Sequence, residues 1–118
     1  MRLPDRATPF SQFVEFVVDP LHVQALVTAL IARVERFTCH CPGFISAQVH
    51  VSEAGDRVLM QLLWPSKRYS ELAIERAQTV EPDLFDLARQ HHASALFFST
   101  FNAVAQVCAA PAAQGGAQ

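Results

Sequence analysis

The sequence predicts a single α+β domain in which helices cover one face of an antiparallel sheet. Three observations carry this prediction. Apolar residues recur at helical spacing in one long segment, four segments are rich in Phe, Val and Leu, and these elements alternate in the order strand–helix–strand–strand–helix–strand. With 118 residues the chain has the length of one domain. We expect that domain at 10–108, an N-terminal arm at 1–9 and a flexible tail at 109–118.

The first strand and the first helix are predicted from the N-terminal part of the domain. Phe10–Val18 is rich in Phe and Val and is typical of a strand. Asp19 can cap a helix and Pro20 suits its first turn. Apolar residues at helical spacing then predict a helix from Leu21 to about Thr38.

A hairpin is predicted next. Phe44–Val51 alternates between two sets of side chains, as a strand does. Gly55 lies in a polar loop, and Arg57–Trp64 reads as the returning strand.

The remaining elements complete the order. Ser66 is a candidate cap for a second helix, Glu81-Pro82 is expected to start a further short helix through about His91, and Leu96–Val107 is the last predicted strand. This order is the ferredoxin-like βαββαβ pattern, a sandwich with an antiparallel sheet.

Composition excludes several classes of function. The net charge of −2 argues against a nucleic-acid-binding surface, and 51% hydrophobic residues against a disordered chain. No acidic cluster of the kind that binds calcium is present. Because we find no long apolar run, no signal peptide and an odd number of cysteines, three, we expect a cytoplasmic protein with reduced thiols.

The predicted strands are apolar on both faces, which indicates a second copy. In the first strand Phe13 and Val17 point one way and Phe10, Val14 and Phe16 point the other. Seven of the nine Phe residues fall in predicted strands, and no charged residue follows Arg89 to protect the last strand as a sheet edge. Burial of two or three Phe side chains is worth several kcal/mol at about 25 cal/mol per Å². We therefore expect a homodimer that shares a β-barrel core; the alternative is that the extra helix or the tail covers this face.

The segment PGFISAQVHVSEAGDRVLMQLLWPSKRY resembles the central hairpin of the antibiotic biosynthesis monooxygenase (ABM) family. A Pro-Gly-Phe opening, a Gly turn, a strand that ends in Trp and an aromatic residue on the next helix carry the resemblance, which covers roughly residues 10–107. It implies a dimeric α/β barrel.

The resemblance also implies a chemistry. The family's best-understood members oxidise hydroxy-aromatic or quinol-type substrates with dioxygen and need no flavin, haem or metal. The implied reaction begins with loss of a proton from the substrate, continues with electron transfer to dioxygen, and passes through a peroxide that collapses to a quinone. A homodimer, a small aromatic substrate and dioxygen are the implied partners.

Six site residues are predicted. Trp64 and Tyr69 match the strand-terminal Trp and the helical aromatic of the family, and Arg89 a pocket arginine. Where the oxygenases often carry Asn, four residues before the Trp, this chain has Met60, which is a poor hydrogen-bonding group. His50 could act as a base and alternates with Gln48 along one strand. We thus predict Trp64, Tyr69 and His50 as catalytic, and Arg89, Met60 and Gln48 as substrate-binding.

Each candidate also has a plainer interpretation. Trp64 could be a core aromatic, Tyr69 a helix residue with a solvated hydroxyl, and His50 a solvated strand histidine. Glu15, the charged residue of the first strand, could be a base or could meet an arginine. No metal site is expected at Cys39-His40-Cys41 or at His91-His92, because neighbouring side chains do not converge on one ion.

Two other functions compete with the oxygenase. Met60 favours a non-catalytic barrel that binds a small ligand or serves a stress response. Haem degradation, which related dimeric barrels perform with an Asn on the first strand, ranks lower because the first strand here has no Asn.

Overall fold

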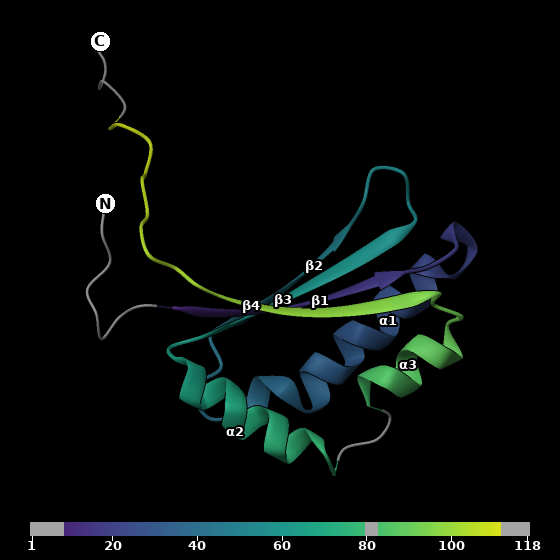
Figure 1. Ribbon diagram of the computed structural model, residues 1–118, viewed down its shortest axis with the longest axis horizontal. Helices are drawn as coiled ribbons and strands as arrows, with labels where there is room; N and C mark the ends of the chain where they lie inside the picture. Colours follow the sequence, from purple (N-terminus) through teal and green to yellow (C-terminus); the bar gives the residue numbers. More distant parts are fainter. Residues whose placement is uncertain (1–8, 80–82, 112–118) are drawn as a thin grey trace.

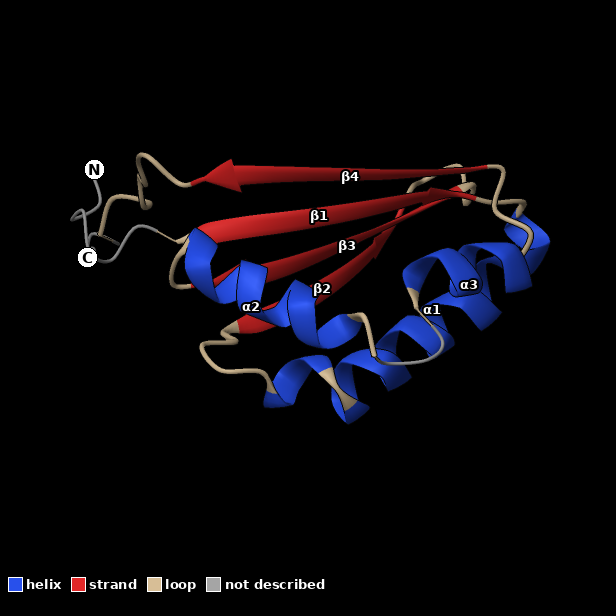
Figure 2. Ribbon diagram, turned by 60° about the horizontal axis from the view of Figure 1, so that its bottom comes forward, coloured by secondary structure: helices blue, strands red, loops and turns tan. Residues whose placement is uncertain are grey.

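A computed structural model describes residues 9–79 and 83–111 (Figure 1). Its elements follow in the order β1 (Phe10–Val17), α1 (Pro20–Arg36), the 3-10 helix η2 (Thr38–His40), β2 (Ser46–Val51), β3 (Arg57–Trp64), α2 (Lys67–Ala77), α3 (Leu84–Gln90) and β4 (Ala95–Asn102). The three α-helices lie on one side of the four strands, so no helix among the described residues covers the other side of the sheet (Figure 2). The predicted α+β, ferredoxin-like fold is confirmed.

The sheet is antiparallel throughout, in the order β2-β3-β1-β4. β1 therefore lies in the interior of the sheet, and β4 forms an edge, as the topology predicts. The register pairs Phe10 with both Trp64 and Asn102, so β1, β3 and β4 end together at the same border of the sheet.

The core forms where the sheet meets the helices. Phe10, Val14 and Phe16 of β1 alternate toward the helices and are buried. The even-numbered residues of β3 and the inner stripe of α1 complete the core: Val58, Met60, Leu62, Trp64, Leu26 and Leu30. Full burial of an apolar side chain of this size stabilises the fold by about 1.5–3 kcal/mol.

Asp19 and Asp83 fix the starts of two helices. The Asp19 carboxylate accepts the backbone N–H of Leu21 at 2.9 Å, ahead of a proline in the first turn of α1. Asp83 and Asp86 form a reciprocal capping box at the start of α3. Ser66 precedes α2 as predicted, but its side chain makes no capping hydrogen bond.

Three predicted boundaries need comment. The last strand ends at Asn102, not Val107, because the register leaves it no partner beyond the start of β1. α3 begins at Leu84, and Glu81-Pro82, where we expected the start of this helix, lies outside the described residues. The expected arm at 1–9 and tail at 109–118 also lie largely outside them.

The sheet surface that faces away from the helices is called the outer face below, and it carries Phe13, Phe97 and Phe101. The rings of Phe13 and Phe101 meet edge to face at 5.5 Å, while Phe97 and Phe101 are 56% and 58% exposed. Glu15 forms an ion pair with Arg57 on this face, at 3.3 Å, which matches the plainer interpretation of this carboxylate.

Two classes of feature are missing from residues 9–79 and 83–111. No helix there is both long and apolar enough to cross a membrane. Within the same ranges no three His, Cys, Asp or Glu side chains gather as a metal site.

The three cysteines are free thiols in different surroundings. Cys39 and Cys108 are exposed, whereas Cys41 is buried. Burial raises the pKa of the Cys41 thiol, and the nearby positive charges of Arg76 and Arg33 offset this only in part. At pH 8 a smaller fraction of Cys41 is therefore thiolate, the reactive form.

We predict that a chromogenic disulfide reagent at pH 8 modifies two thiols quickly and Cys41 more slowly, by about tenfold for each unit of raised pKa. Cys41→Ala should lose only the slow phase. In concentrated urea all three thiols should react alike. Equal rates for Cys41 and Cys39 in the folded protein would contradict this assignment.

Candidate functional site

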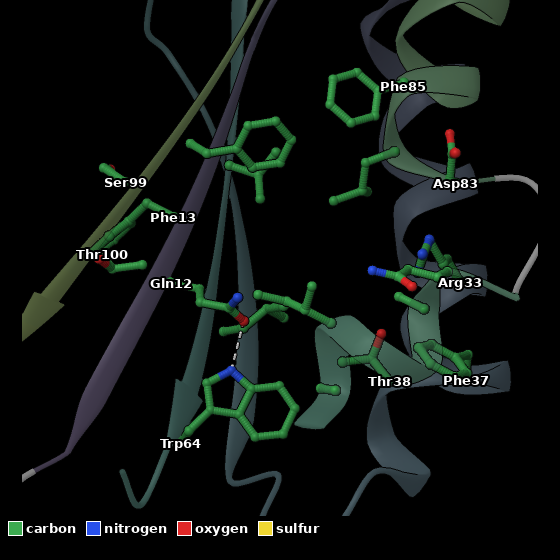
Figure 3. A pocket seen from close by; sticks show the side chains of 18 residues that line it. Gln12, Phe13, Arg33, Phe37, Thr38, Trp64, Asp83, Phe85, Ser99 and Thr100 are labelled. Carbon is green, nitrogen blue, oxygen red and sulfur yellow. Dashed lines mark hydrogen bonds between the residues drawn. The ribbon is translucent and has the colours of Figure 1, made fainter. Parts of the chain in front are cut away.

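A cavity of about 430 Å³ lies between the sheet and the helices (Figure 3). β1, β3 and β4 form one wall, and α1, η2, α2 and α3 form the other. Most of its lining is aliphatic or aromatic: Val14, Phe37, Leu62, Trp64, Ala73, Ile74, Ala77, Leu84, Phe85 and Phe98. Cavities of this size and character bind small organic molecules.

Trp64 and Gln12 contribute a hydrogen-bonded polar pair to the wall of the cavity that the sheet forms. The indole of Trp64 is fully buried, and its Nε1 donates to Oε1 of Gln12 at 2.7 Å. Phe44 packs edge to face on the indole, at 5.7 Å between ring centroids. Because the indole N–H can only donate, it fixes the orientation of the carboxamide. The Gln12 amide nitrogen therefore points away from the indole (Figure 3).

Arg33 is the cation of the opposite wall. It is 9% exposed, and its guanidinium lies over the Phe37 ring at 5.5 Å from the centroid. Its Nε is buried and has no hydrogen-bond partner within the part of the chain that the structure describes. Burial lowers the pKa of Arg33, and the negative charge of Asp83 partly opposes this. The guanidinium stays charged at neutral pH, because arginine does not deprotonate in proteins.

Two phenylalanines mark the opening of the cavity. The rings of Phe85 on α3 and Phe98 on β4 lie 5.5 Å apart. Both line the cavity, yet they are 57% and 52% exposed. The cavity therefore meets solvent where α3 faces the β4 edge of the sheet.

Of the six predicted site residues, Trp64 lines this cavity. Met60 is buried on the same face of β3, but outside the lining. Arg89 is exposed at the end of α3 and pairs with Asp86.

His50 and Gln48 lie on the outer face, and both are exposed. The His50 Nε2 and Gln48 Oε1 atoms are 3.2 Å apart, so these two side chains contact each other. The sheet separates both of them from Trp64, which means that one chain does not bring the predicted catalytic residues together.

Tyr69 packs against a glycine instead of lining the cavity. Gly43 has φ +81, and a Cβ atom built on it would lie 2.5 Å from the Tyr69 ring. The glycine of the Pro-Gly-Phe opening thus leaves room for the aromatic ring at the start of α2. Tyr69 is 39% exposed in this position.

Gln12 and Arg33 were not predicted as site residues, although the sequence carries a signal for each. Gln12 shares a strand face with Phe10, Val14 and Phe16, where a polar residue needs a partner. Arg33 follows Leu30 by three positions on the apolar stripe of its helix, where a charge is unexpected.

The similarity of this chain to known proteins is found by comparing three-dimensional structures. No model of a protein family matches the sequence, and neither does any curated protein. A monooxygenase from the gene ActVA-Orf6 of Streptomyces coelicolor, solved in complex with nanaomycin D, is 21% identical with a TM-score of 0.64 over 92% of this chain and 96% of that chain. SnoaB, a cofactor-independent oxygenase from Streptomyces nogalater, is 15% identical with a TM-score of 0.59 over 86% of this chain and 98% of that chain.

The protein Rv0793 of Mycobacterium tuberculosis is also similar, at 14% identity and a TM-score of 0.63 over 85% of this chain and 99% of that chain. At such identities the similarity establishes the fold. The expected likeness to antibiotic biosynthesis monooxygenases is confirmed at that level.

We predict that Gly43→Ala destabilises the protein more than Gly55→Ala. Both glycines have positive φ, which costs an alanine about 1–2 kcal/mol, but a Cβ on Gly55 meets nothing within 4 Å. Urea unfolding followed by Trp64 fluorescence would measure the difference. In a Tyr69→Ala background the two glycine substitutions should become equal, since the clash is gone. A difference that persists there would show that Tyr69 is not its cause.

Proposed function

We propose that the chain is a cofactor-independent monooxygenase of the ABM type that oxidises a hydroxy-aromatic or quinol-type substrate with dioxygen in the cavity beside Trp64. The fold shared with the two Streptomyces oxygenases supports this reaction class. The observation that carries the proposal is the Gln12 carboxamide, held by Trp64 at the wall of an apolar cavity.

Gln12 supplies the hydrogen bond that Met60 cannot. The register pairs Gln12 with Leu62, halfway between Met60 and Trp64 on the neighbouring strand. An amide on β1 thus reaches the region where the related oxygenases often carry an amide on the equivalent of β3. With its oxygen occupied by the indole, the Gln12 amide offers N–H groups to a substrate oxygen.

The chemistry needs little beyond such a donor and a dry cavity. The hydroxy-aromatic substrate loses a proton to water at the cavity mouth, and the resulting anion is stabilised by the Gln12 N–H groups. The anion gives one electron to dioxygen, and the two radicals combine to form a carbon–oxygen bond. The peroxide takes up a proton and loses water, which leaves the quinone carbonyl. The apolar lining protects the radical pair from side reactions.

We predict that Gln12→Leu lowers kcat for anthrone oxidation by about a hundredfold, the usual cost of losing one donor to a developing oxyanion. Trp64→Phe should lower it less, because the amide remains but loses its fixed orientation. Oxygen uptake and anthraquinone formation measure both rates. Gln24→Leu, on the exposed side of α1, is the matched control and should keep wild-type activity.

Wild-type kcat in Gln12→Leu would remove Gln12 from the mechanism. Anthrone that binds and quenches Trp64 fluorescence without oxygen uptake would instead favour the non-catalytic binding function.

We infer that the outer face binds a second copy of this chain. Phe97 and Phe101 are each more than half exposed on this face. The charged residues Glu15 and Arg57 form an ion pair there, so their charges cancel. No charged residue follows Arg89 to protect the β4 edge. Neighbouring exposed apolar side chains that form a patch on one face are typical of protein interfaces. In such a dimer His50 and Gln48 also lie on the sheet face that meets the partner.

We predict that Phe101→Asp converts the protein from a dimer to a monomer, because the variant would bury an unpaired charge in the interface. Sedimentation velocity at micromolar concentration should give twice the 13.0 kDa chain mass for the wild type and the single mass for the variant. Leu21→Glu replaces a side chain on α1 that is more exposed than Phe101, at 82%, and should remain dimeric. A monomeric wild type would exclude the dimer.

A further inference from the structure

Arg33 is a buried cation that the proposed reaction does not use. Its side chain comes from the apolar stripe of α1 and lines the cavity opposite the sheet. Among residues 9–79 and 83–111, no side chain or backbone group accepts a hydrogen bond from its Nε. A buried cation without an ion-pair partner is unfavourable, so an arginine in the wall of a cavity calls for an anionic group that arrives with the ligand.

The groups around Arg33 only partly compensate its charge. Phe37 offers the face of its ring, which attracts a cation but accepts no directed hydrogen bond. Asp83 is near enough to act on Arg33, but its Oδ1 accepts the backbone N–H of Asp86 in the α3 cap, at 2.7 Å. Cys41 also favours the charged form of Arg33, but less than Asp83 does. Ion pairs within the described residues involve Arg57 and Arg89 and leave Arg33 out.

We infer that Arg33 binds an anionic group of the ligand, so that the cavity selects aromatic carboxylates over neutral aromatic molecules of the same shape. This inference rests on the proposed function and narrows its substrate class. A guanidinium presents a planar fork of N–H groups that matches a carboxylate. The low-polarity lining strengthens such a contact, since little water competes with it.

The geometry suits a planar acid that spans the cavity. Arg33 on α1 and Gln12 on β1 face the cavity from opposite walls (Figure 3). A carboxylate at Arg33 leaves the ring system among the aromatic and aliphatic side chains, with its oxygen substituents toward the Gln12 amide. One wall thus holds the ligand's charge and the other its reacting oxygen.

Binding of 2-naphthoate and 2-naphthamide tests the inference, because the two molecules share a shape and differ in charge. Quenching of Trp64, the single tryptophan of the chain, reports occupancy of the cavity. We expect wild-type protein to bind the acid at least about tenfold more tightly than the amide, as a charge-assisted hydrogen bond allows. Arg33→Met should abolish this preference and leave the affinity for the amide within about twofold of the wild-type value.

Arg36→Met is the matched control, since it removes the same charge from the exposed side of the same helix and should keep the preference. Arg33→Lys should give an intermediate preference, because a lysine keeps the charge but not the fork. The wild-type comparison needs no variant and can overturn the inference even if Arg33→Met does not fold, in which case Arg33→Lys tests the role of the arginine.

Equal affinity of wild-type protein for the acid and the amide overturns the inference and leaves the proposed oxygenase standing. A preference that survives in a folded Arg33→Met overturns it as well. If neither ligand binds the wild type, the cavity is not an aromatic site, and the proposed function fails together with the inference.

Discussion

The arrangement of this domain depends on one buried donor, the indole N–H of Trp64. A fully buried N–H must be hydrogen-bonded, and the acceptor here is the Gln12 side chain of the neighbouring strand. That hydrogen bond occupies the carboxamide oxygen of Gln12, so the amide nitrogen is the group that can face the cavity. It also forces a polar residue into the helix-facing row of β1, where the core would otherwise be continuous. The cavity therefore lies where Trp64 and Gln12 interrupt the apolar core. Their hydrogen bond pairs the indole N–H with the carboxamide oxygen and leaves the amide N–H groups without a partner from this pair.

The two faces of the sheet carry different structural features. The helix-facing side holds the core and the cavity, whereas the outer face carries Phe13, Phe97, Phe101 and the Glu15–Arg57 pair. Because side chains alternate along each strand, the Gln12 side chain lies on the helix-facing side and that of its neighbour Phe13 lies on the outer face. The candidate cavity and the surface proposed for a partner are thus separated by one layer of backbone.

Local patterns predicted the fold well and the site less well. The bounds of β3 and the cap at Asp19 follow from alternation and capping chemistry, which act within a few residues. The end of β4 depends on where β1 begins, which is a long-range pairing that the segment itself does not encode. His50 and Trp64 fell into one predicted site because the sequence does not tell which face of the hairpin meets the helices. Gln12 and Arg33 were not predicted as site residues. The role of a polar residue among apolar ones depends on its spatial partner, which the sequence does not show.

The contact between Gly43 and Tyr69 has an evolutionary consequence. It connects the loop before β2 to the first turn of α2, whose later residues Ala73 and Ile74 line the cavity. A side chain at either position restricts what the other can hold, so the two positions should co-vary among relatives of this chain. A small residue in place of the aromatic ring removes the clash at position 43, although the positive φ there still favours glycine. The pair thus acts on the cavity lining from outside it, since neither residue lines the cavity.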